Sequence, residues 1–82
     1  MLNMECKTKL SGEDLLRRLK AFFGEGGLGL DLTEESEACL TFAGGGGYVT
    51  ATLCREEGGQ TRVDLLTQEW DYQVKQFAAG LR

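Results

Sequence analysis

Residues 38–54 read ACLTFAGGGGYVTATLC and contain the clearest structural signal in the chain. Apolar and polar side chains alternate on both sides of the four glycines, which is the period-two pattern of half-buried strands. Consecutive glycines weaken a strand interior but permit a tight reversal. The stretch therefore predicts a β-hairpin that turns at residues 44–47. One side of it would carry Ala38, Leu40, Phe42, Val49, Ala51 and Leu53, and the other Cys39, Thr41, Ala43, Tyr48, Thr50 and Thr52.

Three further segments show the same alternation. Residues 2–7 alternate apolar and polar side chains, and residues 28–33 carry leucine at every second position. Residues 61–69 continue the pattern after the hairpin. Each segment is typical of a strand with one buried face. Polar or glycine-rich turns are expected at Thr33–Ser36 and at Glu56–Gly59, so that the chain would contain five strands.

Two segments have the three- and four-residue apolar spacing of amphipathic helices. Ser11 opens the sequence Ser-Gly-Glu-Asp, which is similar to a capping box, and the apolar stripe that follows extends to Phe23. Gly24 is expected to end this helix in the left-handed conformation. A second helix is predicted over residues 71–81, with Asp71 as its cap. Supporting i,i+4 ion pairs are expected between Glu13 and Arg17, Asp14 and Arg18, and Asp71 and Lys75.

The order of these segments predicts an α+β fold with the element order β-α-β-β-β-β-α. The antiparallel sheet would be curved, with both helices packed on one face. Because 82 residues are too few for two cores, we expect a single domain over residues 1–82. The sequence leaves open whether the first strand pairs with the last strand or with the second. It also leaves open where the last strand ends and the last helix begins.

Composition and charge exclude several classes of function. A formal net charge of −4 argues against a general binder of nucleic acid or of anionic membranes. The chain has no histidine, which excludes imidazole chemistry and makes a zinc site implausible. The sequence shows no signal peptide and no apolar run of the roughly 18–20 residues that span a bilayer. Because Cys6, Cys39 and Cys54 form no C-x-x-C pair, we expect reduced thiols and a cytoplasmic protein.

No motif predicts catalysis. Residues 24–29 match G-x-G-x-x-G, but they follow a predicted helix and precede a strand, whereas a dinucleotide site needs the reverse order. The glycines at 44–47 lack the Lys-Ser/Thr of a phosphate-binding loop. The acidic residues fall in predicted turns, where carboxylates are solvated rather than convergent. We therefore expect no enzymatic activity, no cofactor and no metal. The acidic residues in question are Asp31, Glu34, Glu35, Glu37, Glu56 and Glu57.

The polar side of the predicted sheet is the strongest candidate for a functional surface. It is uncharged over much of its area and contains aromatic and hydroxyl side chains, as interfaces do. Self-association through this face would also stabilise a domain with a small core. We expect the protein to act by protein–protein contact, most simply as a homodimer, although an ordinary solvated sheet face is the alternative. The candidate interface residues are Thr41, Tyr48, Thr50, Thr52 and Leu66, with Thr61 and Trp70 beside them.

Over Leu2 to Leu81, the element order resembles that of the helix-grip folds. It looks like a minimal version of the half-repeat of TATA-binding proteins and of the START and polyketide-cyclase-like lipid-binding domains. The resemblance rests on the order of elements and on a terminal helix that follows a long strand. It implies a second possible function, the binding of a small apolar ligand between the last helix and the sheet. The residues that would contact such a ligand are Trp70, Val74, Phe77 and Leu81.

Overall fold

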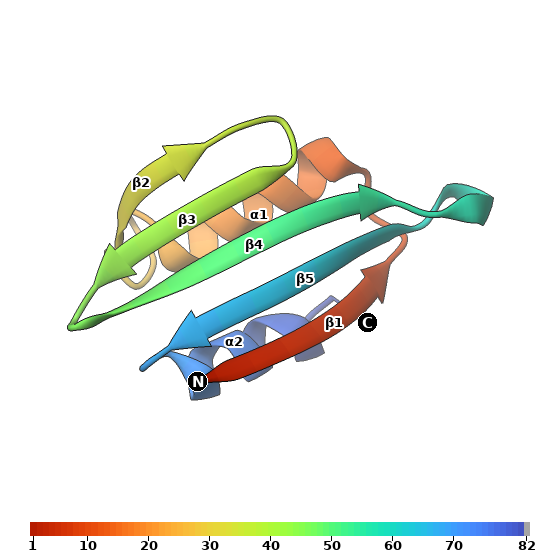
Figure 1. The fold of residues 1–82 in the computed structure, drawn as a ribbon. Helices are drawn as coiled ribbons and strands as arrows, with labels where there is room; N and C mark the ends of the chain where they lie inside the picture. The colour runs from red at the N-terminus through yellow and green to blue at the C-terminus, as the bar shows by residue number, and fades with distance from the viewer. Residues whose placement is uncertain (82) are drawn as a thin grey trace.

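The computed structural model describes residues 1–81 and consists of one five-stranded antiparallel sheet with two helices on one face (Figure 1). The α+β class and the element order predicted from the sequence are confirmed. A short 3-10 helix, Glu57–Gly59, lies between β4 and β5. The strands are β1 (Leu2–Thr8), β2 (Asp31–Glu35), β3 (Cys39–Gly44), β4 (Gly47–Arg55) and β5 (Thr61–Gln68), and the helices are α1 (Gly12–Phe23) and α2 (Asp71–Ala79).

The strand order in the sheet is β1-β5-β4-β3-β2. The first strand therefore pairs with the last one, with Leu2 opposite Thr67 and Thr8 opposite Thr61. This pairing answers the question that the sequence left open. It also places β5 between β1 and β4, so that β1 and β2 form the two edges of the sheet.

The β3–β4 hairpin turns as its glycines predict. Gly44 pairs with Gly47, and the two residues between them have positive φ, 59° at Gly45 and 81° at Gly46. A two-residue turn with positive φ at both central positions matches the right-handed twist of the flanking strands. The turn thus fixes the register in which Phe42 lies opposite Val49.

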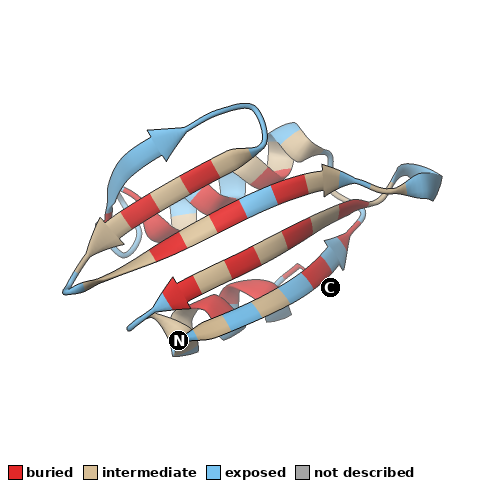
Figure 2. Cartoon of the chain, viewed as in Figure 1, coloured by how far each residue is buried: buried red, intermediate tan, exposed pale blue. Residues whose placement is uncertain are grey.

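The core lies between the helices and the inner faces of the central strands, and Figure 2 shows the resulting alternation of buried residues along β3, β4 and β5. Phe23 of α1 is fully buried at its centre. Its ring centroid lies 5.8 Å from that of Phe42 in β3 and 5.4 Å from that of Phe77 in α2. One side chain therefore joins both helices to the sheet. The buried apolar residues of the helices are Leu15, Leu19, Phe23, Val74, Phe77 and Ala78.

Helix α1 begins at the predicted cap. The Ser11 hydroxyl accepts a hydrogen bond from the backbone N–H of Asp14, 3.1 Å away. We expect Ser11→Ala to lower the free energy of unfolding by about 1 kcal/mol, because one helix N–H loses its partner. Urea denaturation measures this loss. Ser36→Ala, at an exposed serine in the β2–β3 turn, is the control and should change stability by less than about 0.5 kcal/mol; equal losses would contradict the capping role.

The second strand begins later than predicted. β2 starts at Asp31 rather than at Leu28, and Leu28 lies in the α1–β2 loop with 38% of its surface exposed. The backbone N–H groups of Leu28 and Leu30 donate instead to the carbonyls of Phe22 and Phe23. The alternating leucines thus mark a loop that closes the end of the helix. The strand also continues through Glu35, so the turn predicted over Thr33–Ser36 is wrong.

Two helix-end predictions are also wrong. Gly24 is not left-handed, since its φ is −87°. Glycine is required there for space, because a Cβ would lie 2.6 Å from the Lys20 carbonyl oxygen. Asp71 is the first residue of α2 rather than its cap; the cap position is Trp70, which makes no capping side-chain hydrogen bond. The helix ends at Ala79, two residues before the predicted end.

The ion pairs on the helices differ in part from those predicted. Arg17 forms the expected ion pair with Glu13 at 3.9 Å, and it also forms an ion pair with Asp14 at 3.0 Å. Within residues 1–81, Arg18 and Lys75 form no ion pair. Asp14 thus pairs with Arg17 at i,i+3 instead of with Arg18 at i,i+4, since both spacings bring side chains together on a helix.

The two edges of the sheet differ. All five residues of β2 are exposed, three of them are acidic, and the register shifts between Leu32 and Glu34. Glu35 at the end of β2 pairs with Lys20 of α1. β1 is longer and pairs with β5 without a register shift. Short, charged and irregular edge strands resist pairing with another chain, so β2 is the protected edge.

Candidate functional site

The candidate site is the sheet face that points away from the helices, called the open face below. Residues directly opposite one another on paired strands share a face. Thr50 pairs with Thr41 on one side and with Leu66 on the other, which forms an uncharged row across β3, β4 and β5. Tyr48 and Thr52 flank Thr50 on β4 by strand alternation. All five predicted interface residues therefore lie together on the open face.

Side-chain contacts organise the middle of the open face. The hydroxyls of Thr41 and Thr50 lie 3.2 Å apart, within hydrogen-bond distance. The Cys39 sulfur lies 4.0 Å from the Thr52 hydroxyl in the neighbouring row. Thr41, Thr50 and Leu66 are half-buried, although no helix within residues 1–81 covers this side. The row is thus a dense, uncharged surface, called the threonine–leucine row below.

Two residues predicted beside this surface lie elsewhere. Thr61 shares the alternation of Val63 and points into the core, where its hydroxyl donates to the Leu10 carbonyl at 2.8 Å. Trp70 follows the end of β5, and its indole N–H donates to the Gly44 carbonyl at 2.9 Å. Trp70 therefore braces the β3–β4 turn rather than extending the open face.

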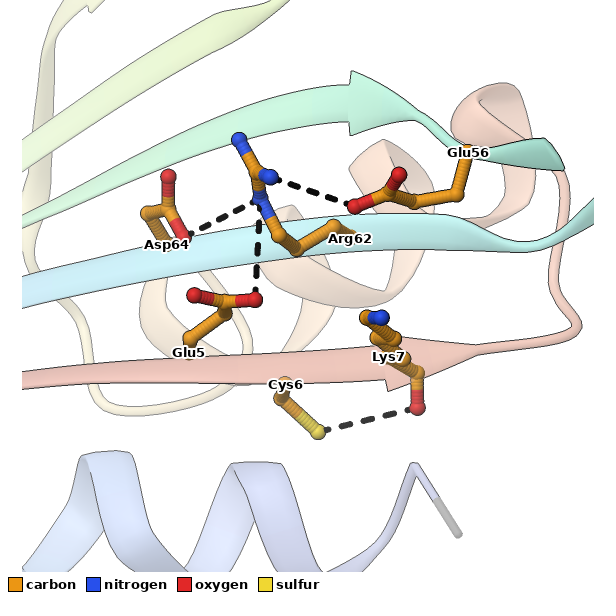
Figure 3. Close-up of polar contacts among 6 residues, drawn as sticks. All are labelled: Glu5, Cys6, Lys7, Glu56, Arg62 and Asp64. Carbon is orange, nitrogen blue, oxygen red and sulfur yellow. Dashed lines mark hydrogen bonds and ion pairs between the residues drawn. The ribbon is translucent and has the colours of Figure 1, made fainter.

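A charged cluster borders the row at the other end of β5 (Figure 3). Nη1 of Arg62 lies 3.1 Å from Oε1 of Glu56, and its Nε lies 3.4 Å from Oδ1 of Asp64 and 3.9 Å from Oε1 of Glu5. Three carboxylates thus surround one guanidinium. Asp64 contributes most to raising the pKa of Arg62, followed by Cys54, while partial burial opposes the rise. Arg62 therefore stays charged at every accessible pH.

The Arg62 cluster was not predicted from the sequence. Glu5 lies directly opposite Asp64, so two like charges face each other across β1 and β5, and Arg62 compensates them. Arg62 and Asp64 are two residues apart in one strand, so the sequence alone indicates that they lie on the same face. The contribution of Glu5 depends on the β1–β5 pairing, which the sequence left open. The Nε of Arg62 is buried without a hydrogen-bond partner in residues 1–81, so the cluster leaves one buried donor unsatisfied.

The residues predicted to contact an apolar ligand belong to the core. Val74 is fully buried, and Phe77 and Leu81 are nearly so. Phe77 contacts the ring of Phe23, and Trp70 packs against the same cluster. These side chains fill the space between α2 and the sheet themselves.

Within residues 1–81, no three Cys, Asp or Glu side chains converge in a way that would hold a metal ion. The three cysteines are free thiols; Cys6 is buried, and Cys39 and Cys54 are half-buried on the open face. The glycines at 24–29 follow the carbonyl end of α1, where phosphate binding is unfavourable. None of the helices over this part of the chain has the length and apolar character to cross a bilayer.

Comparison with known proteins gives no assignment: no protein-family model matches the chain, and no curated protein sequence matches it.

Proposed function

We propose that the protein is a non-enzymatic α+β module that acts by protein–protein contact, and that it self-associates through the open face. The threonine–leucine row supports this proposal. Its centre is uncharged, and charged residues border it at Glu34 in β2 and at the Arg62 cluster. An uncharged centre with a polar rim is the usual composition of a protein interface.

The size of the surface predicts a weak dimer. With strands about 4.8 Å apart and a rise of about 3.4 Å per residue, three strands of five residues cover roughly 240 Å². Stable interfaces bury about 800 Å² on each partner. These three strands alone are therefore too small, and the contact must extend along the strands and over β1. We expect association in the micromolar range.

Two-fold symmetry suits the charges on this face. In an isologous dimer, each surface patch meets the same patch of the second copy. An axis through Thr50 places the two Arg62 clusters on opposite sides of the axis. Each cluster has more carboxylates than guanidinium groups, and this arrangement keeps the two clusters apart. The uncharged rows of the two copies then meet at the centre.

The direct test introduces charge at the centre of the row. We expect Thr50→Lys/Thr52→Lys to abolish association, because four ammonium groups would face one another in the dimer. Sedimentation equilibrium at tens of micromolar counts the protomers. The control is Tyr72→Lys/Ala79→Lys, which adds the same charge at exposed positions of α2. A strictly monomeric wild-type protein, or equal effects of the two double variants, would contradict the proposal.

The native thiols test which surface is used. Cys39 and Cys54 lie on the open face, whereas Cys6 is buried on the other side of the sheet. A short bismaleimide should therefore join two copies of the wild-type protein in solution. Cys39→Ser/Cys54→Ser should form the same dimer but lose the cross-link. A dimer that the wild-type thiols do not cross-link would mean that another surface associates.

Two finer points belong to this proposal. We assign the fold to the helix-grip type, supported by its element order and by the two helices on one face. We also place the protein in the cytoplasm, where its three free thiols would stay reduced.

A further inference from the structure

Two adjoining depressions lie on the helix side of the molecule. The first, about 330 Å³, runs between α1 and α2. The second, about 540 Å³, lies where the end of α2 meets the end of β1. Both are lined by Arg18, Gly80 and Leu81, so they form one continuous site. We call the first part the groove and the second part the basic pocket.

The fold builds the groove from one face of each helix. Arg18, Ala21 and Phe22 are three or four residues apart and lie on the same side of α1. Phe22 and Phe77 meet edge to face, with centroids 5.4 Å apart, and form the floor between the helices. The groove is therefore apolar along Ala21, Phe22, Phe77 and Leu81, with Arg18 and Gln76 as its polar residues.

The basic pocket is formed where the end of β1 meets the residues after α2, beside Arg18 of α1. The Thr8 hydroxyl donates to the Leu81 carbonyl at 3.3 Å and ties the end of β1 to the residues after α2. Gly80, which has no side chain, also lines this pocket. Lys9 and Arg18 line this pocket with the backbone region of Lys7, and no acidic residue within 1–81 is among its lining.

The positive charge of this pocket contrasts with the net charge of −4 of the chain. The ion pairs within residues 1–81 use Arg17, Lys20 and Arg62, and leave Lys7, Lys9 and Arg18 without an acidic partner. The carbonyl end of α2 supplies about half a negative charge and is compensated by one cation at most. Because Lys7 pairs with Arg62, its side chain lies on the open face, and Lys9 and Arg18 are the cations left for a ligand on the helix side.

We infer that the groove and the basic pocket together bind a single small amphipathic anion. Its apolar chain lies between the helices, and its anionic head lies by Lys9 and Arg18. Ligand sites commonly enclose about 300–1,000 Å³ and combine apolar walls with a few polar groups. The site lies on the layer opposite the open face, so it does not depend on self-association.

The first experiment measures how much the anionic head group contributes to the affinity. Decanoate and decan-1-ol have the same chain length and differ in charge, and calorimetric titration of each gives its affinity. We expect decanoate to bind with one molecule per chain and about tenfold more tightly than the alcohol. Lys9→Gln/Arg18→Gln should remove this preference and leave the affinity for the alcohol unchanged. The control, Arg17→Gln/Lys75→Gln, removes two exposed charges outside the site and should bind decanoate within twofold of wild type.

The second experiment tests whether the groove holds the apolar chain of the ligand. Ala21 is exposed on α1, so Ala21→Trp should fold normally while its indole fills the groove. We expect this variant to lose binding of both probes by at least tenfold. Ala79→Trp, at an exposed alanine of α2 outside the lining, should retain it. Circular dichroism and thermal unfolding establish that each variant is folded.

Three outcomes would overturn the inference. The first is the absence of decanoate binding by wild type at millimolar concentration. The second is binding that survives both Ala21→Trp and Lys9→Gln/Arg18→Gln. The third is co-sedimentation with phosphatidylglycerol vesicles without binding of monomeric decanoate, because the surface would then bind a membrane instead of a single molecule. None of these results bears on the dimer, whose failure is detected by sedimentation.

Discussion

Replacing Phe23 by alanine is expected to lower the free energy of unfolding by about 4 kcal/mol. Phe23 is fully buried and contacts the rings of Phe22, Phe42 and Phe77, so its loss leaves a cavity that both helices and β3 border. A domain of this size has about 4–12 kcal/mol of stability in total. The midpoint of thermal unfolding should fall by about 20 °C, measured by calorimetry or circular dichroism.

Phe22→Ala is the matched control for Phe23→Ala. The two phenylalanines are neighbours on α1, but Phe22 is only half-buried and borders the groove. Its removal exposes less new surface and leaves no closed cavity. We expect a loss of about 1–2 kcal/mol. If Phe22→Ala cost as much as Phe23→Ala, the core would not be centred where the structure places it.

Gly47→Ala is the second substitution with a large expected effect. A Cβ at Gly47 would lie 2.0 Å from the carbonyl oxygen of Gln68, a backbone atom that cannot move alone. The end of β5 would have to separate from β4, which we expect to cost about 3 kcal/mol. Urea denaturation measures the loss, and amide hydrogen exchange should show it concentrated where β4 meets β5.

Gly46→Ala separates crowding from backbone conformation. Gly46 is in the same turn with a φ of 81°, but apart from its chain neighbours no atom of residues 1–81 lies within 4 Å of the Cβ position. Only the cost of a left-handed alanine applies, about 1 kcal/mol. Equal losses at the two positions would show that the turn tolerates crowding and that conformation alone requires the glycines.

The hairpin and α1 could be predicted because each is determined by local sequence. Gly45 and Gly46 supply the positive φ values of the turn, and Ser11 supplies the cap of α1. The residues between α1 and β2 were predicted to begin a strand but form a loop, because alternating apolar residues also occur in loops. There, the backbone N–H groups of Leu28 and Leu30 donate to carbonyls of α1 instead of to a neighbouring strand. These hydrogen bonds depend on how the loop packs on the helix, which the alternation of apolar residues does not specify.

The candidate sites show the same division. Alternation alone placed Thr41, Thr50 and Leu66 on one face, because the period of a strand is independent of its partner. The Arg62 cluster requires the β1–β5 register, and the basic pocket requires the end of α2 to meet the end of β1. Residues from distant parts of the chain meet at both places, and one sequence contains no signal for such meetings.

The difference between β1 and β2 has a consequence for polymer formation. A fibre grows by adding chains at two free borders, and each new chain must present a border to the next. With β2 short, acidic and irregular, only β1 can accept a foreign strand. Strand addition at β1 joins at most two molecules and then stops, so that even a crowded solution of this protein would not extend into filaments by this route.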